Sequence, residues 1–216
     1  MTPSGTPTDK APAPSAAADN RYPFENTAPE VSVVEDTTPW PAPPADPTAA
    51  VTAAVASTAD KGIEQAVVII DRGSGAVLTQ ISPDETYPAL SLVKLMIAAD
   101  VLSGGGSGAA KVDAATSARL REMIVRSDDV TAADYYDEGG GDELINRVVQ
   151  RFSLTGSSPT PDGEYWGNVQ TTATDMSSLV SQILANPGLS AVIAPAMKAT
   201  AAFVAAVRAA MGGPSR

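Results

Sequence analysis

The chain has 216 residues, a net charge of −11 and neither cysteine nor histidine. This length suffices for one substantial hydrophobic core. The acidic balance argues against nucleic acid and anionic membrane surfaces as partners, because phosphate binding needs clustered lysine and arginine. The missing residue types exclude disulfides, thiolate chemistry and a Ser-His-Asp triad, and we expect no metal ion and no cofactor. Any nucleophilic chemistry must therefore use serine, lysine, tyrosine and carboxylates.

Residues 1–47 are crowded with proline, alanine, threonine and acidic residues. Such a segment buries too little apolar surface to offset its ordering entropy, so we expect a disordered tether. No hydrophobic signal region follows Met1, and no apolar run reaches the roughly 18 residues that a membrane span needs. A leader of this composition is typical of tethered, exported proteins. We therefore expect a secreted or cell-envelope protein whose signal or lipid-anchor segment is not present in this chain.

Residues 48–216 are predicted to form an α+β domain that is mostly helical. An alanine-rich helix runs from Pro47 to Lys61, and Gly62 ends it. The β-branched runs 65–71 and 76–81 flank a glycine-containing turn and predict an antiparallel hairpin. Periodic apolar residues and helix-start signals at Pro88, Asp142 and Thr171 predict later helices over 87–102, 114–126, 142–152, 171–186 and about 189–211.

The helix predicted over 87–102 is almost wholly apolar, yet it carries Ser91 and Lys94 in its first turns. Residues three apart share a helix face, with Cβ atoms about 5–6 Å apart. A lysine inside an apolar helix must find a partner or lose its proton. A neutral lysine beside a serine is a base beside a nucleophile, although the S-x-x-K pattern alone also arises by chance.

The motifs in their order resemble class A β-lactamases and the related penicillin-binding-type serine hydrolases, especially the alanine-rich exported versions of actinobacteria. The resemblance covers about 48–200 and rests on motifs that follow one another in register. They are the hairpin turn 71–75, Ser91-Leu92-Val93-Lys94, the run 123–129, the glycine break before Leu144 and the run 171–176. It implies a β-lactamase/transpeptidase-like helical domain with an N-terminal antiparallel hairpin.

By this resemblance Ser91 is the acylated nucleophile, Lys94 the adjacent base and Ser127 the serine that relays a proton to the leaving nitrogen. Asp129 stands at the substrate-binding asparagine of the family's S-D-N motif. An alternative to these catalytic roles is that the run 127–129 is a helix N-cap without chemical function. The aspartate also differs chemically from an amide, because a carboxylate only accepts hydrogen bonds and could hold Lys94 charged, which would make it a poor base.

Two departures from the family concern the loop before Thr171 and the end of the chain. The loop contains Glu164, but its spacing does not match the family's deacylating glutamate, and a solvent-facing carboxylate is the simpler interpretation. No Lys-Thr-Gly occurs, so we expect the domain to lack the family's C-terminal strands and the hairpin to lack further sheet partners.

Two functions are compatible with these features. The first is a serine-hydrolase-type domain whose serine is acylated by β-lactam or peptidoglycan-like amides. The second is a catalytically silent cell-envelope lipoprotein of the same fold, with a binding or structural role. A helical bundle without a site is a third option, against which the hairpin and the register of Ser91 and Ser127 argue.

Overall fold

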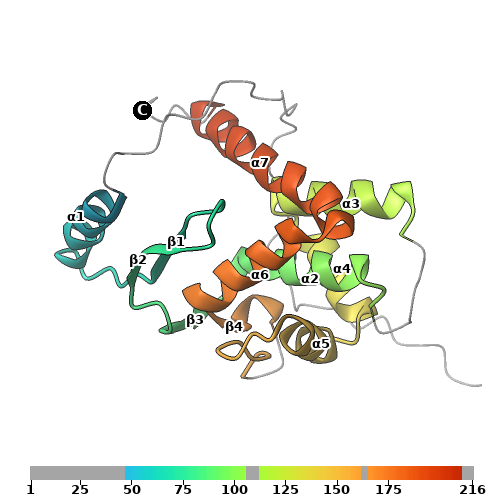
Figure 1. Ribbon diagram of the computed structural model, residues 1–216. Helices are drawn as coiled ribbons and strands as arrows, with labels where there is room; N and C mark the ends of the chain where they lie inside the picture. Colours follow the sequence, from blue (N-terminus) through green and yellow to red (C-terminus); the bar gives the residue numbers. More distant parts are fainter. Residues whose placement is uncertain (1–46, 106–111, 162–164, 211–216) are drawn as a thin grey trace, which may run out of the picture.

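The computed structural model describes residues 47–105, 112–161 and 165–210, and side chains over most of these ranges up to residue 200 (Figure 1). Most of the predicted tether and Glu164 lie outside the described residues. The architecture is mostly helical, with two small antiparallel sheets. The prediction of a mostly helical α+β domain is therefore confirmed.

The predicted hairpin is present and begins the β structure. Helix α1 (Pro47–Ala59) precedes strands β1 (Val67–Ile70) and β2 (Val77–Ile81), which pair antiparallel with Val67 opposite Ile81. The side chain of Asp71 closes the turn by accepting hydrogen bonds from the backbone N–H and the hydroxyl of Ser74, each 2.7 Å long. Among the described residues β1 and β2 pair only with each other, while α1 packs against β2 and helix α6 (Ala173–Ala185) against β1.

A second sheet joins two segments that are far apart in the sequence. Strand β3 (Thr86–Pro88) pairs antiparallel with β4 (Gln170–Thr172), with Tyr87 opposite Thr171. Pro88 therefore ends a strand, and the prediction that it opens a helix was wrong. The start of α6 was also misplaced, because Thr172 is its N-cap and Thr171 belongs to the strand. Strands of three residues are too short to show a period, so only their pairing reveals them.

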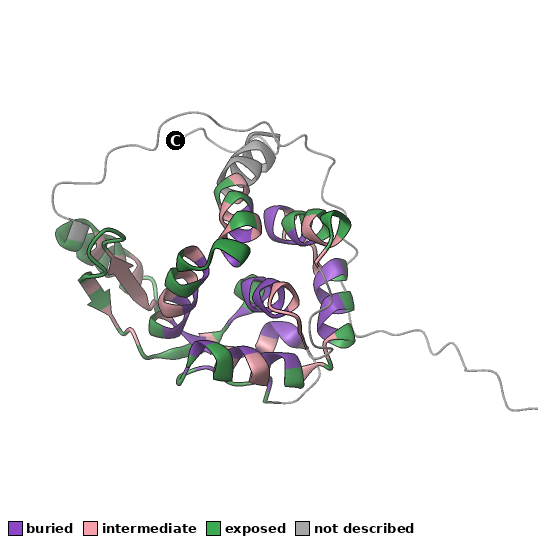
Figure 2. Ribbon diagram, turned by 45° about the vertical axis from the view of Figure 1, so that its right-hand side comes forward, coloured by how far each residue is buried: buried purple, intermediate pink, exposed green. Residues whose placement is uncertain are grey.

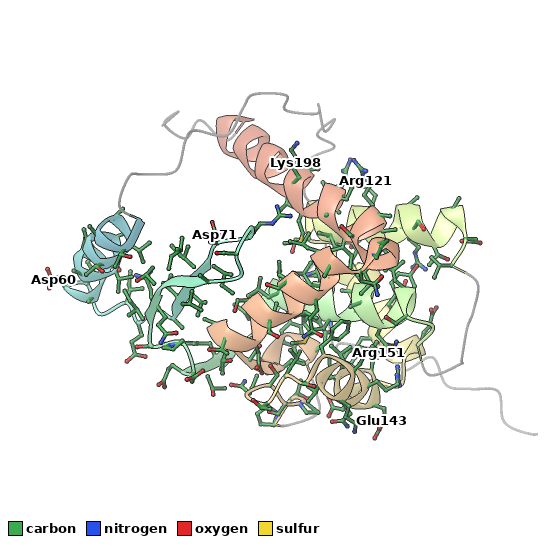
Figure 3. The ribbon with its side chains drawn as sticks, in the orientation of Figure 1. Asp60, Asp71, Arg121, Glu143, Arg151 and Lys198 are labelled. Atoms are coloured by element: carbon green, nitrogen blue, oxygen red, sulfur yellow. The ribbon has the colours of Figure 1, made fainter. Side chains whose placement is uncertain are left out.

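Helix α2 (Val93–Leu102) is the centre of the helical part, and every residue from Val93 to Asp100 is buried. The 3-10 turn η1 (Leu90–Leu92) leads into it. Around it lie the helices α3 (Ala114–Arg126), α4 (Asp129–Glu138), α5 (Asp142–Phe152) and α7 (Pro187–Ala210). Their buried faces turn inward toward α2 (Figure 2). The exposed side chains of Arg121, Glu143, Arg151 and Lys198 point outward from this cluster (Figure 3).

Polar contacts anchor the helix ends. Asp100, only 2% exposed, accepts hydrogen bonds from Arg147 at 2.7 and 3.1 Å and thereby ties α2 to α5. The prediction that Asp142 caps α5 was wrong, because Gly141 holds the cap position. The Asp142 carboxylate instead accepts hydrogen bonds from the Tyr136 and Thr160 hydroxyls.

No described helix is by itself long and apolar enough to cross a membrane. Helix α6 and the part of α7 up to Thr200 meet that test only as a pair, and they are bent by 116° relative to one another.

Candidate active site

Ser91 lies in the 3-10 turn that connects β3 to α2. The residue before it, Leu90, has a φ of 47°, a left-handed conformation that costs a residue with a Cβ about 1–3 kcal/mol. The turn is fastened to the chain ahead of β4 because the Ala89 N–H donates to the carbonyl of Val169 at 2.7 Å. The strained backbone presents the Ser91 side chain at an exposed position above the buried start of α2.

Lys94 lies one turn further on and is 2% exposed. Its ammonium group donates to Ser91 Oγ at 3.3 Å and to Asp129 Oδ1 at 2.7 Å. The contact with Asp129 is an ion pair in which the carboxylate side chain is 35% exposed. The buried lysine has therefore found a partner, as its place in an apolar helix required.

Ser127 ends α3 in a left-handed conformation, with a φ of 55°, and its Oγ lies 2.7 Å from Ser91 Oγ. Within the run 127–129, the residue that caps a helix is Asp128. Its side chain accepts hydrogen bonds from the N–H groups of Val130 and Thr131 at the start of α4. The side chains of Ser127 and Asp129 contact Ser91 and Lys94 instead. The structure thus brings together Ser91, Lys94, Ser127 and Asp129.

An aromatic pair that the sequence analysis did not assign to the site completes the surroundings of Lys94. The Trp166 ring lies in the turn η2 (Trp166–Asn168), and Lys94 Nζ is 4.5 Å from its centroid. Trp166 is 2% exposed, and the ring of Tyr165 is 5.0 Å away at 40°. Burial, with a smaller effect from the charge of Asp129, raises the pKa of Tyr165. A tryptophan in an otherwise polar loop was the signal available in the sequence.

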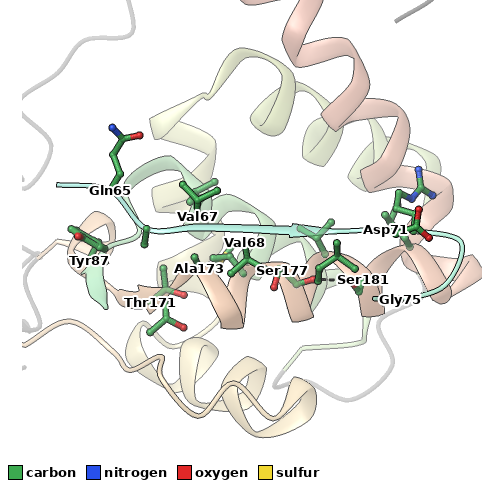
Figure 4. Close-up of a pocket in the computed structure, with 18 of the residues that line it drawn as sticks. Gln65, Val67, Val68, Asp71, Gly75, Tyr87, Thr171, Ala173, Ser177 and Ser181 are labelled. Atoms are coloured by element: carbon green, nitrogen blue, oxygen red, sulfur yellow. Dashed lines mark hydrogen bonds between the residues drawn. The ribbon is translucent and has the colours of Figure 1, made fainter. Parts of the chain in front are cut away.

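A cavity lies beside this cluster, and Ser91 is not among the residues that line it. It has a volume of about 900 Å³ and is bounded by β1 and α6, with Leu92 on its wall. Figure 4 shows three of the residues that line the cavity, Val68 on β1 and Ser177 and Ser181 on α6. Ser91 does not line it, so the chemistry assigned to the serine does not depend on this cavity.

Among the described residues, the Lys94 ammonium contacts Ser91 and is paired with the Asp129 carboxylate. Among residues 47–105, 112–161 and 165–200, no group of three or more histidine, cysteine, aspartate or glutamate side chains could hold a metal ion. The arrangement is a hydroxyl held between an ammonium and a second hydroxyl, which is suited to nucleophilic attack with proton relay.

The fold matches solved β-lactamases. A β-lactamase from Burkholderia vietnamiensis is 21% identical and aligns over 70% of this chain and 65% of its own, with a TM-score of 0.52. A variant of the last common ancestor of the class A β-lactamases of Gram-negative bacteria is 16% identical over 73% of this chain and 70% of its own, with a TM-score of 0.51. The chain has the β-lactamase/transpeptidase fold. The fold predicted from the sequence is confirmed.

The chain also has sequence relatives among mycobacterial proteins. The chain is 26% identical over 108 residues to a Mycobacterium tuberculosis protein named "Putative lipoprotein LppW". The aligned residues make up 50% of this chain and 34% of that protein, so the match spans about a third of the relative's length. No family model matches the chain. A relative named as a lipoprotein agrees with the expectation of an exported β-lactamase-like protein.

Proposed function

We propose that this domain forms a covalent ester between Ser91 and the carbonyl group of a β-lactam or a peptidoglycan-like amide. The observation that carries the proposal is the position of Ser91 Oγ, 3.3 Å from Lys94 Nζ and 2.7 Å from Ser127 Oγ. The 2.7 Å distance is within the reach over which a proton can pass, and the 3.3 Å distance is slightly longer, as is common in catalytic sites without a bound substrate.

In the proposed step Ser91 Oγ attacks the carbonyl carbon and the carbon–nitrogen bond breaks. Ser127 accepts the proton of Ser91 while its own proton passes to the leaving nitrogen, which balances the transfer. The family role of Lys94 is that of a base, but the ion pair with Asp129 requires the charged ammonium. Acylation is therefore proposed to be slow, with Lys94 stabilising the oxygen of Ser91 as it gains negative charge.

Incubation with a fluorescent penicillin, followed by intact mass measurement and peptide mapping, tests the proposal. The expected result is a single adduct on Ser91 that is absent in Ser91→Ala. Ser117→Ala is the matched control, because the Ser117 hydroxyl donates to the backbone carbonyl of Asp113, the N-cap of α3, and not to the residues around Ser91. A folded protein that gains no mass on Ser91 would exclude acylation.

The second candidate is a catalytically silent envelope protein of the same fold. It is favoured by the Lys94–Asp129 ion pair and by the lipoprotein name of the mycobacterial relative. Turnover of a chromogenic β-lactam that disappears in Ser91→Ala would exclude it. In both cases we place the domain at the cell envelope, with residues 1–47 as a tether and 48–216 as the domain.

A further inference from the structure

The ammonium group of Lys94 has three N–H bonds, and the structure supplies three partners for them. They are Ser91 Oγ at 3.3 Å, Asp129 Oδ1 at 2.7 Å and the face of the Trp166 ring, whose centroid is 4.5 Å away. An aromatic face attracts a cation at this distance. Because Lys94 is 2% exposed, its N–H groups have no further direction in which to hold a water molecule.

The position of the Trp166 ring is held by its neighbours. Tyr165 packs against it at 5.0 Å. The lack of a side chain at Gly167 leaves room for the Tyr165 ring, because a Cβ at that position would clash with Tyr165 Cε1. Since Ala89 donates to Val169, the backbone of this loop is tied directly to the turn that carries Ser91. The ring is therefore a fixed part of the nucleophile site.

Hydrogen bonding does not explain why a tryptophan occupies this place. Its Nε1 is buried, and no acceptor for it is present in the described part of the chain. A buried donor without an acceptor is unfavourable, and native proteins keep few of them. What the ring contributes is its volume and its face toward Lys94.

We propose that Trp166 closes the buried side of the nucleophile site against water, so that an acyl group on Ser91 is retained and not hydrolysed. Hydrolysis needs a water molecule to attack the ester carbonyl and pass a proton to a base, after which Ser91 departs with a proton of its own. Trp166 fills the space beside Lys94 in which such a water would be held. The domain is thus a covalent receptor for its amide ligand, and Trp166 is a positioning residue.

This inference rests on the proposed acylation of Ser91, and its test measures a separate quantity, the lifetime of the adduct. The wild type, Trp166→Phe and Trp166→Leu are acylated with a fluorescent penicillin, freed of excess reagent and followed by intact mass. The wild-type adduct should persist, and Trp166→Phe, which keeps an aromatic face and removes the unpaired N–H, should retain it equally well. In Trp166→Leu we expect the adduct to decay about tenfold faster or more, because water gains access.

A second measurement needs no variant. Hydroxylamine, a nucleophile nearly as small as water, should release the adduct slowly from the folded wild type and rapidly after unfolding in urea. This comparison decides the matter if circular dichroism shows that Trp166→Leu does not fold. Equal release from the folded and unfolded forms, or equal lifetimes in the wild type and a folded Trp166→Leu, would overturn the inference. An adduct that never forms on Ser91 would instead overturn the proposed function, and this inference with it.

Discussion

At Asp129 a single carboxylate stands where the S-D-N motif has an amide, and it sets the charge balance around Ser91. The substitution is visible in the sequence, where an ion pair with Lys94 was one of the roles open to the carboxylate. The structure contains that pair, at 2.7 Å. The prediction depended only on chemistry, since a buried lysine needs a counter-charge and the substituted motif supplies one.

Asp129→Asn should accelerate the acylation of Ser91. The amide removes the carboxylate that competes with Ser91 for the Lys94 ammonium, so the ammonium is freer to stabilise Ser91 Oγ as it gains negative charge. A gain of about tenfold corresponds to roughly 1.4 kcal/mol in the barrier. The rate of adduct formation with a fluorescent penicillin measures this. Asp134→Asn makes the same chemical change on the outer side of α4, where Asp134 pairs with the exposed Arg119, and should leave the rate unchanged. A slower reaction in Asp129→Asn would show that the carboxylate assists the step.

Among the structural elements, the junction between α3 and α4 determines where Ser127 and Asp129 lie. The left-handed Ser127 ends one helix and the Asp128 cap begins the next, so the two flanking side chains are directed to Ser91 and Lys94. The sequence predicted a cap within this run but left open which residue provides it. Neighbouring Ser and Asp residues have similar capping preferences, so only the backbone conformation distinguishes them.

Asp128→Ala should destabilise the protein by about 1 kcal/mol, because it removes the acceptor for the first N–H groups of α4. Denaturant unfolding followed by circular dichroism measures the loss. Asp128→Asn keeps a capping oxygen and should retain most of the stability. An alanine variant as stable as the wild type would show that solvent satisfies the start of α4 equally well.

For the molecule as a whole, the free energy of unfolding depends on pH in the alkaline range because the fold disfavours the ionisation of two tyrosines. Burial raises the pKa of Tyr135 and, with the charge of Asp129, the pKa of Tyr165 above the ordinary value. A raised pKa means that the folded state retains protons after the unfolded state has released them. This contribution is complete below the unfolded pKa of about 10 and is lost as the pH rises through the higher folded values.

The free energy of unfolding should accordingly fall as the pH rises above about 10. Tyr165→Phe should fall less steeply, because phenylalanine has no proton to release. Urea unfolding at a series of alkaline pH values checks both statements. Parallel curves for the wild type and the variant would show that Tyr165 ionises as readily in the folded state as in the unfolded state.

The amino-acid sequence was sufficient for the features that depend on neighbours along the chain. The hairpin around the 72–75 turn, the apolar helix α2 with Lys94 near its start, and the bounds of α3 all follow from local periodicity and turn chemistry. These signals repeat over two to four residues, so they can be read without knowing the fold. The order of such segments was enough to predict the β-lactamase/transpeptidase fold.

Packing alone settled the contacts between distant segments. Ser91 and Ser127 are 36 residues apart, β3 and β4 about twice that, and Trp166 approaches Lys94 from a loop whose composition is polar. No local sequence pattern predicts these long-range contacts. The segments come together only when the helices pack and bury apolar surface around α2. The chemistry of the site was therefore present in the residue types, and its geometry arose from the core that surrounds them.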